Sequence, residues 1–423
     1  SMTRVIYILC CLLFCSGIVL ADSDPAEIRA LWVTRDHLYR RRQIDEFISR
    51  AQKSNFNTVF VQVRGRGEAF YNSRIEPKAQ LKEDFDPLAY TITKGHQAKL
   101  KIHAWINAYY VWSYWKKPAS PDHVLNRHPD WVVADKYGKS LMQYSWDEIT
   151  GAGIEGYYLS PGIPAVNNYL YDVYMEVVRK YDVDGIHFDY VRYPSAYFGF
   201  EWPICRAYMN SYGVDPKTLY QNPYALKISY GAAGFSALRE SWSGRRADAV
   251  SDLVRRIYLS IQKESPQVLV SAAVFPDLVQ AKVDNGQAWA DWLGEGIVDF
   301  VVPMAYGTNT ARVRYQIIRA ARAARGRFVL AGLGAYVNSA ASIIDKVNAI
   351  KAAKRDQYLN NLKGVALFSY DELKDKTAYW DKIKTAIFPT PAALPNFPWK
   401  RNVVAAEPST FKKESESAGE VKR

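Results

Sequence analysis

The chain has 423 residues, 48% of them hydrophobic, and a formal net charge of +12. This size suits one large catalytic domain or two ordinary ones, and the apolar content is typical of a globular protein. The positive charge favours an anionic polymer, such as a cell-wall glycan, or an anionic membrane surface as partner. We expect no nucleic-acid partner, because the chain has no Cys/His zinc pattern and no basic helix interleaved with base-stacking aromatic residues.

The first residues are typical of a secretory signal peptide. Arg4 precedes an apolar run over 5–20, and small residues at Val19 and Ala21 form a cleavage site. We predict a signal peptide over 1–21 and export to the periplasm, the outer membrane surface or the outside of the cell. The run is too short for a convincing membrane span, so we expect no stable span after cleavage. Three of the four cysteines lie in this segment, and the remaining Cys205 has no partner for a disulfide.

Strand-like apolar runs alternate with amphipathic helical segments along the rest of the chain. The runs cover 28–35, 57–64, 101–107, 185–190, 268–275, 299–306, 328–334 and 364–370. Such alternation predicts parallel βαβ units, and eight of them predict an α/β protein with a (β/α)₈ TIM barrel. The alternative is an open doubly wound sheet, which is weakened because no glycine-rich phosphate motif follows the first run.

Two connections, 109–160 after the third strand and 195–245 after the fourth, are long and rich in aromatic residues. Long loops in compact domains are usually functional or disordered. We expect both to form ordered walls of a substrate cleft at the carboxyl ends of the strands. The catalytic domain is predicted over 27–388. The composition then turns to Pro, Ala, Ser, Lys and Glu, which predicts a mostly disordered tail over 389–423.

The fourth predicted strand contains the strongest catalytic candidate. Side chains of a strand alternate, so His187 and Asp189 share the face that points into the barrel. Asp189 lies at the carboxyl end of its strand, where barrel enzymes place their chemistry. His187 lies one layer lower and fits a packed, hydrogen-bonded wall. Asp184 and Asp299 precede their strands at the opposite end, so we interpret them as stability residues.

Inward parity on the second and third strands, together with the ends of the other strands and the loop after the second, predicts a ring of further polar side chains. They are Arg35, Asp36, His37, Gln62, Arg64, Arg66, Glu68, His103, Trp105, Asn107, Asp277, Tyr306, Ser369, Tyr370 and Asp371. Buried charges are costly unless they pair, so Arg64, Arg66, Glu68 and Asp189 could instead form a structural ion network.

Glycoside hydrolysis uses two carboxyl groups that flank the scissile bond. Asp189 and Glu68 come from different sides of the ring and could supply this pair, with Asp277 and Asp371 as substitutes. The histidines have no HExxH-type spacing, and there is no Gly-x-Ser-x-Gly motif. We therefore expect neither a metal site nor a cofactor, and no serine-hydrolase chemistry.

Several sequence blocks resemble the glycosyl-hydrolase-like family ten group, over about residues 27 to 375. They cover 29–34, 57–69, 102–107, 160–164, the strand of Asp189, and 289–306, which ends in Pro-Met-Ala-Tyr. The resemblance implies a barrel glycosidase fold. It also implies an exported or lipid-anchored bacterial enzyme that cuts peptidoglycan strands stripped of stem peptides, between N-acetylmuramic acid and N-acetylglucosamine.

The same resemblance assigns residue roles. Asp189 matches the family's acidic residue after the fourth strand, where some relatives carry two successive acids and this chain has Tyr190 second. Glu68 is the best match to the family's acid in the loop after the second strand.

These observations lead to one functional expectation: a secreted glycoside hydrolase for an anionic bacterial cell-wall glycan. Asp189 is expected to act as nucleophile or base and Glu68 as proton donor. The alternatives are a glycosidase for another polysaccharide, such as an α-glucan or a uronic-acid polymer, or a non-catalytic carbohydrate-binding barrel. The expected substrate-binding residues are Arg64, Arg66, Asn107, Tyr109, His187, Arg192, Tyr193, Asp277, Tyr306, Tyr370 and Asp371.

Overall fold

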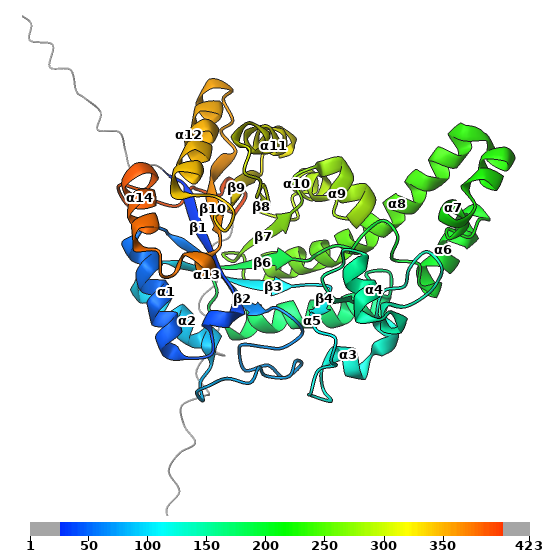
Figure 1. Ribbon diagram of the computed structural model, residues 1–423, viewed down its shortest axis with the longest axis horizontal. Helices are drawn as coiled ribbons and strands as arrows, with labels where there is room; N and C mark the ends of the chain where they lie inside the picture. Colours follow the sequence, from blue (N-terminus) through cyan, green and yellow to red (C-terminus); the bar gives the residue numbers. More distant parts are fainter. Residues whose placement is uncertain (1–25, 401–423) are drawn as a thin grey trace, which may run out of the picture.

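The computed structural model describes residues 26–400, and eight parallel strands form a closed barrel at its centre (Figure 1). Their order around the barrel is β1-β10-β9-β8-β7-β6-β3-β2. The strands are β1 (Ile28–Val33), β2 (Thr58–Arg64), β3 (Lys101–Asn107), β6 (Gly185–Asp189), β7 (Leu269–Val274), β8 (Phe300–Pro303), β9 (Phe328–Gly334) and β10 (Leu362–Phe368). Each strand coincides with one of the eight predicted runs, so the predicted (β/α)₈ barrel is confirmed. The predicted signal peptide lies outside the described residues.

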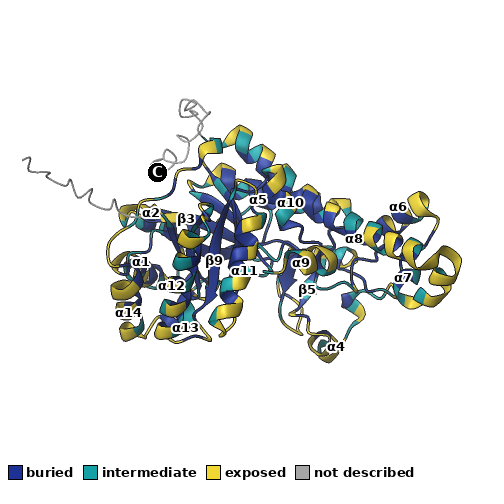
Figure 2. Cartoon of the chain, turned by 90° about the horizontal axis from the view of Figure 1, so that it is seen from above, coloured by how far each residue is buried: buried dark blue, intermediate teal, exposed yellow. Residues whose placement is uncertain are grey.

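Helices surround the barrel, with their buried faces toward the strands and exposed faces outward (Figure 2). Those that cover it are α1 (Arg41–Lys53), α2 (Pro87–Gln97), α5 (Pro164–Lys180), α8 (Pro223–Glu264), α9 (Leu278–Asn285), α10 (Trp289–Glu295), α11 (Thr310–Ala323), α12 (Ala340–Asp356), α13 (Tyr370–Leu373) and α14 (Thr377–Ile387). Within residues 26–400, no helix is long and apolar enough to cross a bilayer.

The interior of the barrel is an aromatic core. Trp32, Phe60, Trp105 and Phe300 belong to one buried cluster that contains inward side chains of the strands. The His187 ring stacks on Phe60 with a centroid distance of 4.1 Å. On the opposite face of the same strand, Ile186 and Phe188 pack with the outer helices. The alternation along β6 therefore follows the predicted parity.

The connection after β3 folds into a small subdomain above the barrel. It contains a two-stranded sheet of β4 (Tyr110–Trp112) and β5 (Tyr157–Tyr158), together with α3 (Val124–Arg127) and α4 (Trp146–Gly151). Short 3₁₀ segments at Pro129–Trp131 and Leu141–Gln143 complete it.

The connection after β6 forms an arm that extends to one side (Figure 1). It consists of α6 (Trp202–Tyr212), α7 (Thr218–Gln221) and the first half of the 42-residue α8, which is interrupted at Gly231 where φ is 73°. Phe200, Tyr208 and Trp242 form a separate core inside this arm. Part of the aromatic content predicted to wall the cleft, including Phe200, Tyr208 and Trp242, is therefore used to fold the arm itself.

The segment 389–400 departs from the predicted disordered tail, because it packs across the amino-terminal end of the barrel. Phe397 joins the barrel core, and Trp399 donates to the buried Asp299 carboxylate at 2.6 Å. Lys400 lies 3.1 Å and Arg327 3.2 Å from the same carboxylate. Apolar side chains of this segment close the amino-terminal end of the barrel. The composition of the segment did not indicate this role. Residues 401–423 lie outside the described range.

Replacing Asp299 by Asn should lower the free energy of unfolding by about 3–5 kcal/mol, since two cations would keep their buried positions without a counter-charge. Urea unfolding followed by circular dichroism measures this change. The matched control is Asp291→Asn, which breaks an exposed pair with Lys282 and should cost less than about 1 kcal/mol. Equal effects in the two variants would contradict the role assigned to Asp299.

Candidate active site

Asp189 lies at the carboxyl end of β6, and the indole of Trp105 holds its carboxylate in place. The Trp105 Nε1–H points at both Asp189 Oδ2 (3.0 Å) and Asn107 Oδ1 (3.1 Å). Asn107 in turn donates from Nδ2 to the Gly65 carbonyl at 2.8 Å. These contacts join the ends of β2, β3 and β6, so three strands position one acid.

Burial raises the pKa of Asp189 to about 6, against hydrogen bonds from Tyr190 N and Trp105 and the charge of Arg192, which lower it. The carboxyl group remains partly accessible at the mouth of the barrel. A carboxyl group with a pKa near the working pH can exchange protons with a substrate at little free-energy cost. Its placement therefore suits acid–base or nucleophilic chemistry.

Tyr190 adopts a left-handed backbone conformation, with φ of 47°. A non-glycine residue adopts this conformation only where its surroundings hold it. Its amide donates to Asp189 Oδ1 at 2.7 Å, while its ring stacks on Tyr110 with a centroid distance of 4.6 Å. The Arg192 guanidinium covers the same ring at 4.8 Å. Tyr190 thus contributes a fixed aromatic wall beside Asp189.

Glu155 is an acid near this site that the sequence analysis missed. Its Oε1 pairs with Arg192 Nη2 at 3.2 Å, and its Oε2 accepts a hydrogen bond from Tyr158 at 2.7 Å. The charge of Glu155 also contributes to the raised pKa of Asp189. The sequence feature that could have pointed to Glu155 is its position between two glycines. Gly153 has a φ of 70°, and a Cβ on Gly156 would lie 2.0 Å from the Trp112 carbonyl oxygen. Gly156 permits a tight approach of the loop to β4, and Gly153 adopts the positive φ that the turn before it requires.

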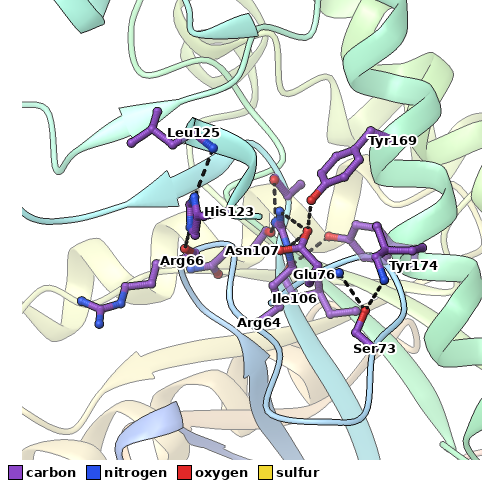
Figure 3. Close-up of polar contacts among 12 residues, drawn as sticks. Arg64, Arg66, Ser73, Glu76, Ile106, Asn107, His123, Leu125, Tyr169 and Tyr174 are labelled. Carbon is purple, nitrogen blue, oxygen red and sulfur yellow. Dashed lines mark hydrogen bonds and ion pairs between the residues drawn. The ribbon is translucent and has the colours of Figure 1, made fainter. Parts of the chain in front are cut away.

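Glu68 and Arg66 lie on the loop after β2 and face solvent in part. Arg66 Nε lies 3.2 Å from Glu68 Oε2, and the Arg66 guanidinium covers Trp112 at 4.4 Å. The buried His123 ring contacts the Arg66 carbonyl at 2.8 Å, which fixes the loop (Figure 3). Within residues 26–400, no hydrogen bond or ion pair joins Glu68 to Asp189.

Arg64 turns away from the mouth, contrary to its predicted role in substrate binding. It is fully buried and pairs with Glu76 at 2.9 Å, while Tyr169 donates to the same carboxylate (Figure 3). The register of β2 against β3 shifts between residues 62 and 64. Such a bulge reverses the side on which the next side chain emerges. The parity argument therefore fails for Arg64, which stabilises the strand end from outside the barrel.

Three other predicted substrate-binding residues are also packed away from the mouth. His187 is buried between the Trp32 indole N–H, at 3.0 Å, and the Ser271 hydroxyl, at 2.8 Å. Tyr109 is buried and donates to Asn167 of α5 at 2.8 Å. Tyr193 is buried beneath Arg246, whose guanidinium lies 4.3 Å from the ring centroid. The polar groups of His187 and Tyr109 thus bond to neighbouring elements, whereas the buried Tyr193 hydroxyl has no hydrogen-bond partner within residues 26–400.

Tyr306 remains at the mouth, stacked on Phe368 at 5.2 Å. Burial raises its pKa, and the neighbouring charge of Asp189 adds to this effect. Asp371 lies in α13, directly after β10, where Thr34, His37 and Ser369 surround its carboxylate and lower its pKa despite burial.

The remaining two predicted residues do not lie at the centre of the mouth. Tyr370 is buried and packs edge-on against His37 at 4.8 Å. Asp277 is exposed at the start of α9, where its Oδ1 accepts from two backbone amides. In the described part of the chain, no cluster of three or more His, Cys, Asp or Glu side chains has the arrangement of a metal site.

Comparison with known proteins places this chain in a family. The model of the family "Glycosyl hydrolase-like 10" matches residues 27–352. The glycosyl hydrolase YngK of Bacillus subtilis strain 168 is 27% identical, over 93% of this chain and 78% of that protein. The glycosyl hydrolase DigH of Escherichia coli K12 is 25% identical over 67% of this chain. The match spans 62% of DigH, which is less than two thirds of its length.

Solved structures show the same fold. The glycoside hydrolase domain of PgaB (BpsB) from Bordetella bronchiseptica has a TM-score of 0.63 at 15% identity, over 88% of this chain and all of that domain. The catalytic domain of a Paenibacillus polymyxa β-amylase has a TM-score of 0.55 at 12% identity, over 86% of this chain and 99% of that domain. With the family match over most of the barrel, the chain belongs to the Glycosyl hydrolase-like 10 family and is a glycoside hydrolase.

Proposed function

We propose that this enzyme is exported and cleaves the glycan strands of bacterial cell wall, with peptidoglycan lacking stem peptides as its substrate. The observation that carries the proposal is the Asp189 carboxyl group at the barrel mouth, held by Trp105 and with a raised pKa. The sequence blocks shared with the family, the net charge of +12 and the apolar amino-terminal run support the choice of an anionic, extracytoplasmic glycan.

Asp189 supplies the nucleophile or the base in this mechanism. Its carboxylate lies beside aromatic side chains that limit hydration, and the Trp105 N–H fixes the orientation of one oxygen. The other oxygen accepts from the Tyr190 amide. A positive charge develops on the sugar ring in the transition state, and a fixed carboxylate stabilises it electrostatically.

The second carboxyl group must donate a proton to the leaving oxygen. Glu68 is partly exposed on the mouth loop, although Arg66 engages it in the free enzyme. Glu155 is the other candidate, since its charge acts on Asp189 and it pairs with Arg192. We assign the donor role to Glu68 and the role of holding Arg192 to Glu155, which has two partners in place.

Replacing Asp189 by Asn should reduce cleavage of peptide-free glycan strands by about 100- to 10,000-fold, because a neutral amide cannot act as nucleophile or base. Mass spectrometry of the saccharides released from strands with and without stem peptides measures this loss and identifies the bond. The control Asp184→Asn alters an acid just before the other end of the same strand and should retain cleavage. Full activity of Asp189→Asn would remove this residue from the mechanism, and products from another polysaccharide alone would replace the proposed substrate.

The value of kcat/KM should fall about tenfold per pH unit below pH 6, since Asp189 must be ionised to act and its pKa is about 6.

The Trp105 hydrogen bond lowers the pKa of Asp189. Trp105→Phe should therefore move the acidic limb to higher pH, which stopped assays over pH 4–8 would detect. A limb that stays in place would contradict the assigned contact. Activity that rises below pH 6 instead would make Asp189 the proton donor.

Glu68→Gln should lower kcat on natural glycan by about 100-fold or more and leave most activity on an aryl glycoside, whose leaving group needs no protonation. Glu155→Gln should raise KM with a smaller change in kcat, because it loosens Arg192 rather than removing a proton. Steady-state kinetics on both substrates separate the two residues. The opposite pattern would exchange their roles.

A further inference from the structure

A cavity of about 390 Å³ lies between α9 and α11, beside the end of β7. We call it the α9–α11 pocket. Its walls include Phe275, Asp277, Gln280, Arg312, Tyr315 and Arg319. Its volume is within the range of about 300–1,000 Å³ that is usual for small-ligand sites. None of these residues except Asp277 belongs to the predicted site.

Two arginines give the pocket its positive charge. Arg312 and Arg319 are seven residues apart on α11, so about two helical turns place them on one face. In the described part of the chain, no acid forms an ion pair with either guanidinium. Arg319 donates from Nη1 to the Tyr315 hydroxyl at 3.3 Å, and its guanidinium lies 5.8 Å from the centroid of the same ring. Both groups are exposed and free to bind an anion.

Asp277 is the acid in the wall of the pocket, and its charge opposes an anionic ligand. Its Oδ1 accepts hydrogen bonds from the amides of Val279 and Gln280, at 3.0 and 2.9 Å. Asp277 therefore caps α9 through Oδ1, and its Oδ2 can accept hydrogen bonds from hydroxyl groups. Two cations against one such carboxylate leave the pocket with a net positive charge.

The pocket adjoins the candidate active site through a shared wall. Phe275 lines the pocket, and the Arg192 guanidinium covers its ring at 4.7 Å. Asn285, also in the wall, donates to the Tyr193 carbonyl at 3.0 Å. The segment that follows Asp189 in the chain therefore contacts two residues of the pocket wall.

We propose that the α9–α11 pocket binds a carboxylate-bearing sugar residue of the polysaccharide chain, next to the residues at the catalytic centre. This inference rests on the proposed function only in that the substrate is a polysaccharide. A guanidinium fork matches both oxygens of a carboxylate. The exposed ring of Tyr315 supplies an apolar face for a sugar, and the amide of Gln280 and the free oxygen of Asp277 suit its hydroxyl groups.

The carboxylate could come from a lactyl ether on an amino sugar or from a uronic acid, so the test uses both. Isothermal titration calorimetry measures binding of two tetrasaccharides to the Asp189→Asn protein, which prevents turnover. One is the peptide-free N-acetylglucosamine–N-acetylmuramic acid tetrasaccharide, and the other alternates N-acetylglucosamine with glucuronic acid. Each is compared with its neutral methyl ester.

At least one acid form should bind about tenfold more tightly than its ester, since a hydrogen bond to a charged group contributes about that factor. Arg312→Gln and Arg319→Gln should each remove about this advantage. Arg314→Gln on the same helix, outside the pocket, is the matched control and should change nothing. The acid that shows the preference identifies the source of the carboxylate.

The proposal is overturned if acid and ester bind equally, if neither tetrasaccharide binds, or if Arg312→Gln and Arg319→Gln leave the preference intact. Cleavage assays on the two arginine variants with Asp189 in place keep the two hypotheses apart. Cleavage without any acid preference would refute the pocket alone. An acid preference that depends on Arg312 and Arg319, without cleavage by the wild-type protein, would refute the proposed function alone.

Discussion

The indole N–H of Trp105 positions the polar side chains at the mouth of this barrel. It is shared between Asp189 and Asn107, and Asn107 continues to the Gly65 carbonyl. The shared donor couples the orientation of the acid to the ends of β2 and β3. Because Trp105 is itself buried in the barrel core, the position of a polar group depends on the packing of an apolar ring. The catalytic candidate is therefore held by the barrel interior.

The same burial sets the chemistry of the acid. Surroundings with little water penalise the ionised form and raise the pKa of Asp189, while Trp105, the Tyr190 amide and Arg192 act in the opposite direction. The balance is a carboxyl group that titrates near pH 6. In the folded protein this carboxyl group ionises less readily than in the unfolded chain, so its contribution to stability falls as the pH rises through about 6. The raised pKa that suits Asp189 to catalysis therefore makes the folded protein less stable once the carboxyl group is ionised.

The periphery divides between substrate-facing and structural roles. The arginines of the mouth illustrate this: Arg66 and Arg192 each cover an aromatic ring and pair with a partly exposed acid, whereas Arg64 is enclosed with Glu76. The α9–α11 pocket adds two arginines beside this arrangement, and no acid within residues 26–400 forms an ion pair with either. The paired arginines Arg66 and Arg192 hold loops in place, and Arg312 and Arg319 remain available to bind an anionic group.

The sequence alone determined the eight strands, their inward and outward faces and the position of Asp189, because strand alternation and the placement of chemistry at carboxyl ends are local or topological rules. Tertiary structure decided the rest. A bulge between residues 62 and 64 turned Arg64 out of the mouth. Folding of the loop before β5 brought Glu155 to Arg192, and the closure of the barrel by 389–400 depended on contacts with distant strands. Each of these depends on partners far away in the chain, which local patterns do not encode.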